Sequence, residues 1–195
     1  MTVLQRFTFD NLPVTSWRNG GGETREIVSW PAGEAAFAWR ASIATIANDG
    51  PFSRFEGVDR SITLLSGAGV QLSLEGGNEH RLSRPGEPFA FAGETPVCAR
   101  LINGTTTDFN VMTCRAKALA RVTSQHSSFC IHQDRAGVLY VLQGQWQVGN
   151  SCALVTSEGL FWMAGTGNFP EVNVQPLLPE SLMLWVEIET GAVTA

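Results

Sequence analysis

The segment LLSGAGVQLSL at residues 64–74, followed by LSRPGEPFAFAG at residues 82–93, has a parallel later in the chain. That parallel is YVLQGQWQVGN at residues 140–150, followed by LVTSEGLFWMAG at residues 154–165. Both copies join an apolar strand, a glycine-containing turn, a second strand and an aromatic strand that closes on Ala-Gly. Self-similarity on this scale indicates a duplicated structural unit.

The two copies also agree at their turns and ends. Gly67 and Gly144 stand in the turns, and the aromatic strands run from Phe89 to Gly93 and from Phe161 to Gly165. Similar short runs rich in Val, Ile, Phe and Trp recur along the whole chain, separated by Gly, Pro, Asn and Asp. A spacing of roughly 8–12 residues with turn residues between the runs is typical of a β-sandwich or barrel. Helical periodicity is nearly absent; only residues 116–122 suggest a short helical turn or connector.

The turn followed by an apolar strand that closes on glycine resembles the small barrel of cupins. The fold class predicted is therefore mainly β: a two-barrel (bicupin) antiparallel sandwich or barrel with little helix. We expect an N-terminal barrel over residues 1–115, which holds the ligand pocket, and a C-terminal barrel over residues 116–195. The two barrels are expected to pack as one structural unit.

Composition excludes several classes of function. The chain has 195 residues, a net charge of −5 and a pI near 5.2, which argue against a nucleic-acid partner because such a partner normally requires a basic face. No apolar run approaches the roughly 20 residues that span a bilayer, and the first residues do not form a secretory signal. The four cysteines stand singly, so we expect reduced thiols in a cytoplasmic protein, with a disulfide as the minor alternative.

The histidines argue against a metal site. Metal-binding cupins carry two histidines one residue apart, then a glutamate and a distant third histidine, whereas His80, His126 and His132 have no such spacing. His80 lies in the polar segment GGNEHRLSRPGE, where we expect a solvated loop residue. Because a transition-metal centre requires three or more converging ligands, we predict no metal and no other cofactor.

The segment SWRNGGGETRE at residues 16–26 contains three consecutive glycines between charged and aromatic residues. It lacks the Gly-Lys-Ser/Thr ending of a P-loop, and no helix pattern follows it. Consecutive glycines can turn several N–H groups toward one concavity and form an anion-binding nest. A flexible hairpin loop explains the glycines equally well.

The next strand, FAWRASIATI, places Arg40 and Ser42 on one face and Trp39 and Ala41 on the other. Both faces are mostly small or apolar, so Arg40 is expected to be a buried cation that requires a partner. That partner is either an acid of the chain, for which Glu23, Glu26 and Asp59 are the candidates, or the carboxylate of a bound ligand.

Six of the arginines fall within the first 60 residues of an acidic protein, and a planar guanidinium binds carboxylates through two parallel hydrogen bonds. The chain has a single lysine, Lys117, and a GC-rich genome explains that bias as well. Phe52, Ser53 and Arg54 mix aromatic walls with hydrogen-bond donors, as a site for a small organic anion requires. In DFNVMTCR, Asp108 and Asn110 share one face, and they either contact a ligand or simply start the strand.

Together, SWRNGGGETREI, FAWRASIATI, DGPFSRFEGVDR and DFNVM resemble the HutD/Ves family of cupin-like proteins. The resemblance covers most of the first 115 residues; Glu56 departs from it where a proline is common. It implies binding of a histidine-breakdown intermediate such as N-formylglutamate, which would moderate histidine utilisation without catalysis, or membership of the stress-related Ves branch, whose chemistry is not established. The residues expected to bind the ligand are Trp17, Arg18, Asn19, Gly20, Gly21, Gly22, Arg25, Arg40, Ser42, Phe52, Ser53, Asp59, Arg60 and Asn110.

Three functions follow from these observations. The first is non-enzymatic binding of a small carboxylate or dicarboxylate, with no catalytic residue. The second is a metal-independent hydrolase or isomerase that acts on a small acidic metabolite through Glu23, Glu26 or Asp59. The third is a scaffold in which the arginines pair only with acids of the chain. A homodimer formed through sheet edges is also open.

Overall fold

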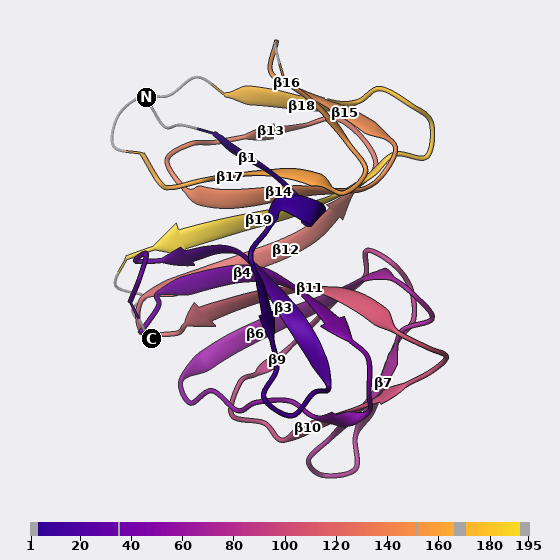
Figure 1. Ribbon diagram of the computed structural model, residues 1–195. Coiled ribbons are helices and arrows are strands. Elements are labelled where there is room, and N and C mark those ends of the chain that lie inside the picture. The colour runs from indigo at the N-terminus through magenta and orange to yellow at the C-terminus, as the bar shows by residue number, and fades with distance from the viewer. Residues whose placement is uncertain (1–3, 35, 151, 166–170, 192–195) are drawn as a thin grey trace.

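The computed structural model describes residues 4–34, 36–150, 152–165 and 171–191. Its strands form four antiparallel sheets, stacked as four layers (Figure 1). Sheet I has the order β5 (Gly50–Pro51), β10 (Val97–Leu101), β7 (Val70–Leu74) and β8 (Glu79–Leu82). Sheet II has the order β2 (Val14–Ser16), β3 (Gly22–Trp30), β4 (Trp39–Ile46), β11 (Thr106–Cys114), β6 (Val58–Ser66) and β9 (Pro88–Ala92).

The other two sheets contain most of the second half of the chain. Sheet III has the order β1 (Gln5–Thr8), β17 (Glu158–Trp162), β14 (Ala136–Gln143), β19 (Leu182–Thr190) and β12 (Ala118–Gln125). Sheet IV has the order β13 (Phe129–Ile131), β18 (Val172–Pro176), β15 (Gln145–Val148) and β16 (Cys152–Val155).

The prediction of a mainly β chain with antiparallel strands is confirmed. Within the described ranges, the helical content is one 3-10 turn, η1 (Phe9–Asn11), and none of their helices is long and apolar enough to cross a membrane. The strand orders run from edge to edge, so the sheets are open rather than closed barrels. The short helical turn or connector expected at residues 116–122 is found only as a turn up to Lys117, because β12 begins at Ala118 and pairs with β19.

Three apolar clusters hold the layers together. One, with Ile62 and Leu72 among its members, fills the space between sheets I and II. A second, with Trp146 and Leu139, lies between sheets III and IV. The third and largest joins sheet II to sheet III and contains Trp39 and residues of β1, β3, β4, β11, β14 and β19.

This layering explains the composition of the central strands. Six of the eight residues of β14 are buried, because sheet III is covered on both faces. A strand that is buried on both faces needs a continuous apolar run rather than an alternating one, and AGVLYV supplies it. The turns of the duplicated unit are also as predicted: Gly67 and Gly144 both have positive φ, at 90° and 82°. In the second copy, however, the aromatic strand β17 spans Glu158–Trp162, three residues earlier than predicted.

The start of the chain belongs to the second half of the molecule. β1 pairs with β17 along its whole length, from Gln5 opposite Phe161 to Thr8 opposite Glu158. Phe7 is buried beside Tyr140, with 6.2 Å between the ring centroids. After η1 the chain passes from sheet III to sheet II, where β2 pairs with β3.

Candidate functional site

The face of sheet II that looks toward sheet I carries the polar residues of the candidate site. On β4, Trp39, Ala41 and Ile43 pack in the cluster between sheets II and III. Side chains alternate along a strand, so Arg40 and Ser42 point to the opposite side, toward sheet I. The alternation predicted for this strand is therefore confirmed.

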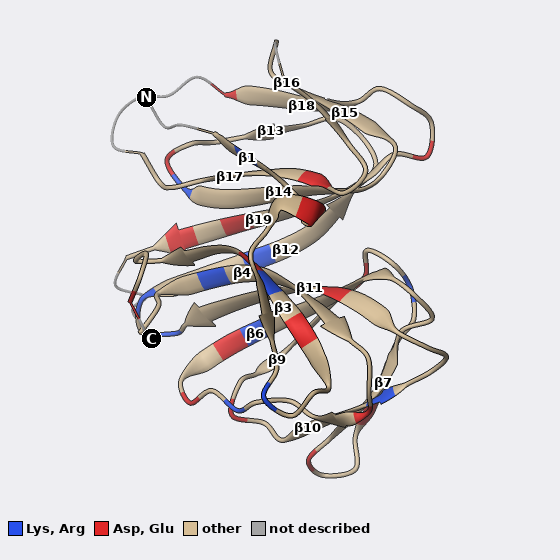
Figure 2. Ribbon diagram, viewed as in Figure 1, with Lys and Arg blue, Asp and Glu red and all other residues tan. Residues whose placement is uncertain are grey.

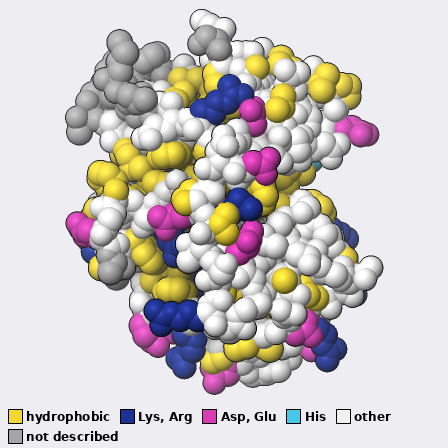
Figure 3. Space-filling model, in the orientation of Figure 1, with side chains coloured by type: hydrophobic (Ala, Val, Ile, Leu, Met, Phe, Trp, Pro, Cys, Tyr) yellow, Lys and Arg dark blue, Asp and Glu magenta, His cyan; other side chains and the backbone are white. Residues whose placement is uncertain are grey.

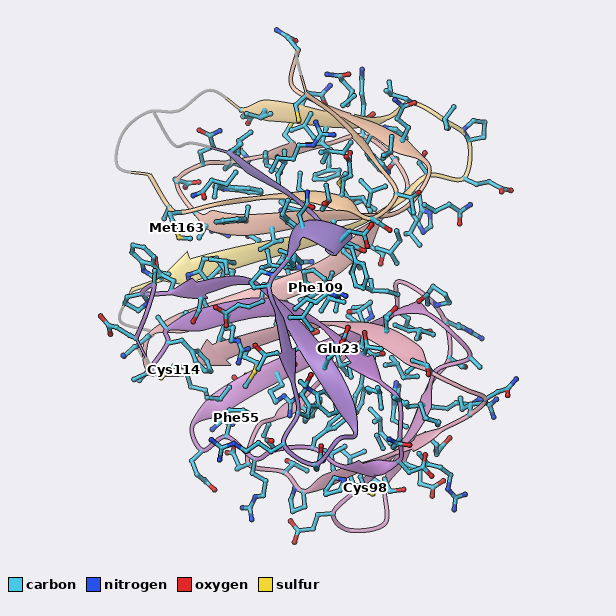
Figure 4. The ribbon with its side chains drawn as sticks, in the orientation of Figure 1. Glu23, Phe55, Cys98, Phe109, Cys114 and Met163 are labelled. Carbon is cyan, nitrogen blue, oxygen red and sulfur yellow. The ribbon has the colours of Figure 1, made fainter. Side chains whose placement is uncertain are left out.

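β11 has the same division of faces. Phe109 (labelled in Figure 4) and Val111 belong to the cluster between sheets II and III. Asp108, Asn110 and Met112 consequently face sheet I, on the same side as Arg40 and Ser42. Two neighbouring strands thus direct their polar residues into one region.

Strand register brings two arginines together in this region. Met112 lies opposite Arg40 on β4 and opposite Arg60 on β6, so the two arginines flank the same methionine. Figure 2 shows basic bands on β4 and β6 and an acidic band on β3. Burial and, to a smaller extent, the positive charge of Arg40 together lower the pKa of Arg60 to about 10. The two guanidinium groups are therefore close enough to repel each other.

Arg60 lies among aromatic rings rather than acids. Its guanidinium carbon is 5.3 Å from the ring centroid of Phe52, 5.7 Å from that of Phe55 and 5.0 Å from that of Phe91. Its Nη1 donates a hydrogen bond to the carbonyl oxygen of Ser53 at 3.2 Å, while Nε is buried without a partner. Among the described residues, no carboxylate forms an ion pair with Arg60. Cation–π contacts therefore hold a cation that has no acidic counter-ion among the described residues.

Arg40 has an acidic neighbour within the same face. Its Nε lies 2.9 Å from Oε2 of Glu26. Glu26 is on β3, opposite Ser42 of β4. The distance is that of an ion pair, but the N–H does not point at the oxygen, because Nε has no partner of hydrogen-bond geometry. The Glu26 side chain is 44% exposed. Of the partners predicted for Arg40, Glu26 is the one found, and the pair is accessible to solvent.

Ser42, Asn110 and Asp108 form the buried polar part of this face. Ser42 lies opposite Asn110, and both are almost fully buried. The Asn110 amide donates to the backbone oxygen of Asp108 at a long 3.4 Å. Asp108 is fully buried, and neither of its carboxyl oxygens has a hydrogen-bond partner. Burial raises the pKa of Asp108 to about 7.

The loop at residues 16–26 closes one side of this face. Trp17 packs against the cluster between sheets I and II, and its Nε1 donates to Oγ1 of Thr24 at 2.8 Å. A Cβ at Gly22 would lie 2.1 Å from the Thr45 carbonyl oxygen and 3.1 Å from the Trp17 ring. Gly22 is therefore required for the close approach of β3, β4 and Trp17.

The remaining glycines of the loop are engaged in its own turn. The N–H of Gly20 donates to the Trp17 carbonyl, and the N–H of Gly21 donates to Oδ1 of Asn19 at 3.0 Å. Asn48 in turn donates to the carbonyls of Gly20 and Gly21. Because these two amides are already bonded within the loop, Asn19 and its neighbours have a structural role in the turn, and a nest of free N–H groups does not form here.

Three other charged residues of the predicted set lie away from the shared face. Arg18 is exposed on the loop. Arg25 stands opposite Ile43, on the side of sheet II that faces sheet III, with its guanidinium carbon 4.5 Å from the Phe9 ring centroid. Asp59 accepts a hydrogen bond from Nε of Arg115 at 2.6 Å.

Asp59 belongs to an ion cluster at the end of β6 and β11. Arg115 also binds Glu94 through both terminal nitrogens, at 2.8 and 2.6 Å. Its hydrogen bonds lower the pKa of Glu94, and Glu94 raises that of Arg115 in return. The cluster is solvent-accessible, so its contribution to stability is small. Asp59 is therefore the counter-ion of Arg115 rather than of Arg40.

Phe52 and Ser53 lie at the margin of the face. Phe52 packs against the cluster between sheets I and II, and Ser53 is exposed and contributes its backbone oxygen to Arg60. On its other side Phe52 lines a surface hollow of about 320 Å³, together with Arg54, Leu74 and Cys98. The hollow lies over sheet I and contains neither Arg40 nor Arg60. Figure 3 shows basic and acidic side chains interspersed on one face of the molecule.

His80 is not in a solvated loop, as the sequence suggested. It lies on β8 opposite Leu72, and its ring stacks on Phe89 with 3.8 Å between the centroids. The polar residues around it face outward from an edge strand, which is why the segment resembles a turn. Within the described residues, no group of three or more His, Cys, Asp or Glu side chains could hold a metal ion.

The structure thus unites Arg40, Ser42, Arg60 and Asn110 on one face, with Trp17 and Phe52 at its edges. Three further residues described above share that face: Glu26, Asp108 and Met112. The sequence indicated Asp108 as a candidate because it lies two positions before Asn110 and so shares its face of the strand. The signal for Met112 was weaker, since its place between the arginines depends on strand register.

A family model described as HutD matches residues 10–175. Protein Ves of Citrobacter koseri is 40% identical over 186 residues, which covers 95% of this chain and 94% of that protein. Protein Ves of Cronobacter sakazakii is 43% identical over 164 residues, which covers 84% of this chain and 89% of that protein.

Solved structures agree with these matches. HutD from Pseudomonas fluorescens SBW25, solved in a formate condition, superposes with a TM-score of 0.85 at 28% identity, covering 97% of this chain and 100% of that one. Oxalate decarboxylase from Lactobacillus farciminis, in a formate complex, has a TM-score of 0.61 at 9% identity, covering 100% of this chain and 88% of that one. At that identity the likeness concerns the fold alone.

Proposed function

The chain belongs to the HutD/Ves family, and from that premise we propose that it binds a small carboxylate without catalysis, on the face of sheet II shared by Arg40 and Arg60. The proposal is carried by Arg60, a partly buried guanidinium whose Nε is fully buried and which contacts three aromatic rings and no acid of the described chain. An unpaired buried cation is costly, and a ligand carboxylate would offset that cost.

Arg40 supplies the second guanidinium group of the proposed carboxylate site. Its ion pair with Glu26 is partly exposed and lacks hydrogen-bond geometry, so a ligand carboxylate that accepts two parallel hydrogen bonds can replace it. Ser42 and Asn110 add neutral hydrogen-bonding groups, and Phe52 and Trp17 provide apolar walls. Apolar walls with a few fixed polar groups are typical of a site for a small organic ligand.

We propose an intermediate of histidine breakdown, N-formylglutamate or a related acid, as the ligand, and moderation of histidine utilisation as the role. The support is the family and the structural likeness to a HutD protein solved in a formate condition. The Ves relatives leave a stress-related role as the alternative within the same family. The four cysteines are free thiols, in keeping with a cytoplasmic location.

We also propose that each pair of facing sheets is one cupin-like barrel, so that the chain is a bicupin with units at 1–115 and 116–195. The duplicated segment and the fold-level likeness to cupin-like structures support this division. In that description β1 is a strand that the first unit contributes to the second.

Isothermal titration calorimetry with N-formylglutamate, formate, urocanate and glutamate tests the binding proposal. We expect at least one of them to bind with a Kd in the micromolar range, near −8 kcal/mol. Arg60→Met should weaken that binding about 30-fold or more, because one buried partner of the carboxylate is lost. Arg100→Met, which removes an exposed arginine on β10, should leave it unchanged.

Arg40→Met separates a ligand-binding role from a purely structural one. Since its ion pair is partly exposed, the substitution should change the free energy of unfolding by about 1 kcal/mol or less while weakening binding. A scaffold role predicts the reverse: a large loss of stability and no ligand. Absence of both heat and a thermal shift with all four ligands at millimolar concentration would contradict the proposal.

Turnover of an acidic metabolite is the second candidate. It is favoured by Asp108, a buried acid on the same face whose pKa, raised by burial to about 7, suits a general acid or base. We expect N-formylglutamate incubated with the protein to give an unchanged proton NMR spectrum. If the wild type released formate and Asp108→Asn did not, the proposal of binding without catalysis would give way to catalysis by Asp108.

A further inference from the structure

Among the described residues, the buried carboxyl group of Asp108 has no hydrogen-bond partner. Its side chain is fully buried on the face of sheet II that carries Arg40 and Arg60, and both oxygens lack a partner within the described structure. Buried polar groups are almost always hydrogen-bonded, so each exception requires an explanation. A partner that arrives from solution is one explanation.

The position of Asp108 relative to the arginines sets the size of such a partner. On β11, Asn110 lies two positions beyond Asp108, and Met112, which the arginines flank, lies four beyond. At about 3.4 Å per residue these steps are roughly 7 and 14 Å along the strand. For one ligand to reach both, the arginine side chains and a short acid with polar groups at both ends must together cover the second distance.

The other titratable groups on the elements around Asp108 are few. Those that share the space between sheets I and II are Glu26 on β3, Arg40 on β4, Arg60 on β6 and His80 on β8, while the other charged residues of these strands stand on their opposite faces. None of them is a hydrogen-bond partner of the carboxyl group, and burial alone raises its pKa to about 7. Its direct cross-strand neighbours are apolar: Ala44 on β4 and Leu64 on β6. Asp108 is therefore poised between its neutral and charged forms near neutral pH.

We propose that Asp108 is the proton-linked end of the same site: as a neutral acid it donates its O–H to the second polar group of a short dicarboxylate or N-acyl amino acid whose first carboxylate lies on Arg40 and Arg60. This inference rests on the proposed function and adds to it the ligand class and a coupled proton. The proton comes from solvent and attaches to a carboxylate oxygen of Asp108, and no covalent bond to the ligand forms.

The coupling has a defined direction. Below about pH 7 Asp108 is already protonated in the free protein, so binding takes up no proton there. Above that pH the free carboxylate is ionised and would repel an anionic ligand, so it must be protonated for the ligand to bind. Affinity should consequently be constant below about pH 7 and fall about tenfold per pH unit above it.

Calorimetry with N-formylglutamate in two buffers of different ionisation enthalpy measures the proton directly. At about pH 8 we expect the uptake of close to one proton per ligand bound, and at about pH 6 none. Asp108→Asn, which keeps an N–H donor in place of the O–H, should bind without proton uptake and with a Kd that does not change between these pH values. Asp59→Asn, which alters an acid paired with Arg115 outside the site, should behave as the wild type.

The outcomes distinguish the role of Asp108 from the proposed carboxylate binding on which it rests. Binding at pH 8 without proton uptake, or uptake that persists in Asp108→Asn, would overturn the role of Asp108 and leave carboxylate binding in place. No binding at any pH would overturn both. If Asp108→Asn does not fold, the wild-type buffer experiment stands alone, and carbon NMR of labelled aspartate should show one carboxyl whose pKa rises when N-formylglutamate is added.

Discussion

Arg60 and Asp108 are opposite charges on the same face of sheet II, yet they form no ion pair with each other. Asp108 is fully buried and Arg60 partly so, and burial shifts the pKa of each toward its neutral form: downward for the arginine and upward for the aspartate. The folded protein therefore retains two costly polar groups that simple pairing would have satisfied. Such costs are concentrated at functional sites, and both residues belong to the proposed one.

The cost of Asp108 predicts a pH-dependent stability. Its pKa is about 7 in the folded chain against an ordinary 3.8, so well below pH 3.8 it is neutral in both states and costs nothing extra. As the pH rises toward 7, the unfolded state ionises first and gains stability, and the free energy of unfolding falls by up to about 4 kcal/mol. Asp108→Asn removes this dependence.

Urea unfolding of both proteins at several values between pH 4.5 and 8 is the measurement. The stability of Asp108→Asn relative to the wild type should increase with pH, by about 3 kcal/mol over that interval. Asp59→Asn, at a solvent-accessible acid, serves as the control for general charge effects. Curves for wild type and Asp108→Asn that stay parallel would show that Asp108 is not the buried acid described here.

Among the elements, β4 and β11 show how much of the site the sequence predicts. Alternation along FAWRASIATI and DFNVMTCR correctly separates Arg40 and Ser42 from the cluster between sheets II and III, and it places Asp108 with Asn110. The same rule puts Asp59 and Arg60 on opposite faces, so the rule itself argues against including both in one site. Local periodicity is predictable because it depends only on the chain's own geometry.

Register between strands could not be predicted in the same way. The facing of Arg25 toward sheet III depends on its pairing with Ile43 and on the irregularity between Glu26 and Val28. The choice of Glu26 among the three acids expected as partners of Arg40 also depends on register. His80 was misplaced because an edge strand exposes polar residues on its outer side, as a loop does. Contacts between distant segments decided each of these cases.

The junction of the glycine loop with β3 gives a prediction at this scale. Gly22→Ala places a methyl group 2.1 Å from the Thr45 carbonyl oxygen and against the Trp17 ring, so β3 and β4 must separate locally. We expect a loss of about 2–4 kcal/mol in the free energy of unfolding. Gly21→Ala meets only the Asn19 side chain, at 3.2 Å, and should cost less than about 1 kcal/mol. Equal losses in chemical denaturation would refute this account of the loop.

At the scale of the whole molecule, the largest apolar cluster lies between the two pairs of sheets rather than within either pair. Sheets II and III both have two buried faces, and residues of β1, β3, β4, β11, β14 and β19 meet there. Separating the halves would expose this cluster to water, which is strongly unfavourable. The two halves are therefore expected to unfold together.

Differential scanning calorimetry should show one transition with equal calorimetric and van't Hoff enthalpies. Phe109→Ala, at a fully buried ring within the shared cluster, should lower the temperature of that single transition and cost about 3–5 kcal/mol. Two resolved transitions in the wild type would mean that each half is stable without the other.

The pairing of β1 with β17 also has a consequence for how the molecule is made. About 150 residues separate Thr8 from Glu158, so at ribosomal speed the first strand waits roughly 10 to 30 seconds for its neighbour. Throughout that interval β1 lacks β17, the strand with which it pairs in the folded protein. β1 can therefore take its native position only after β17 has left the ribosome.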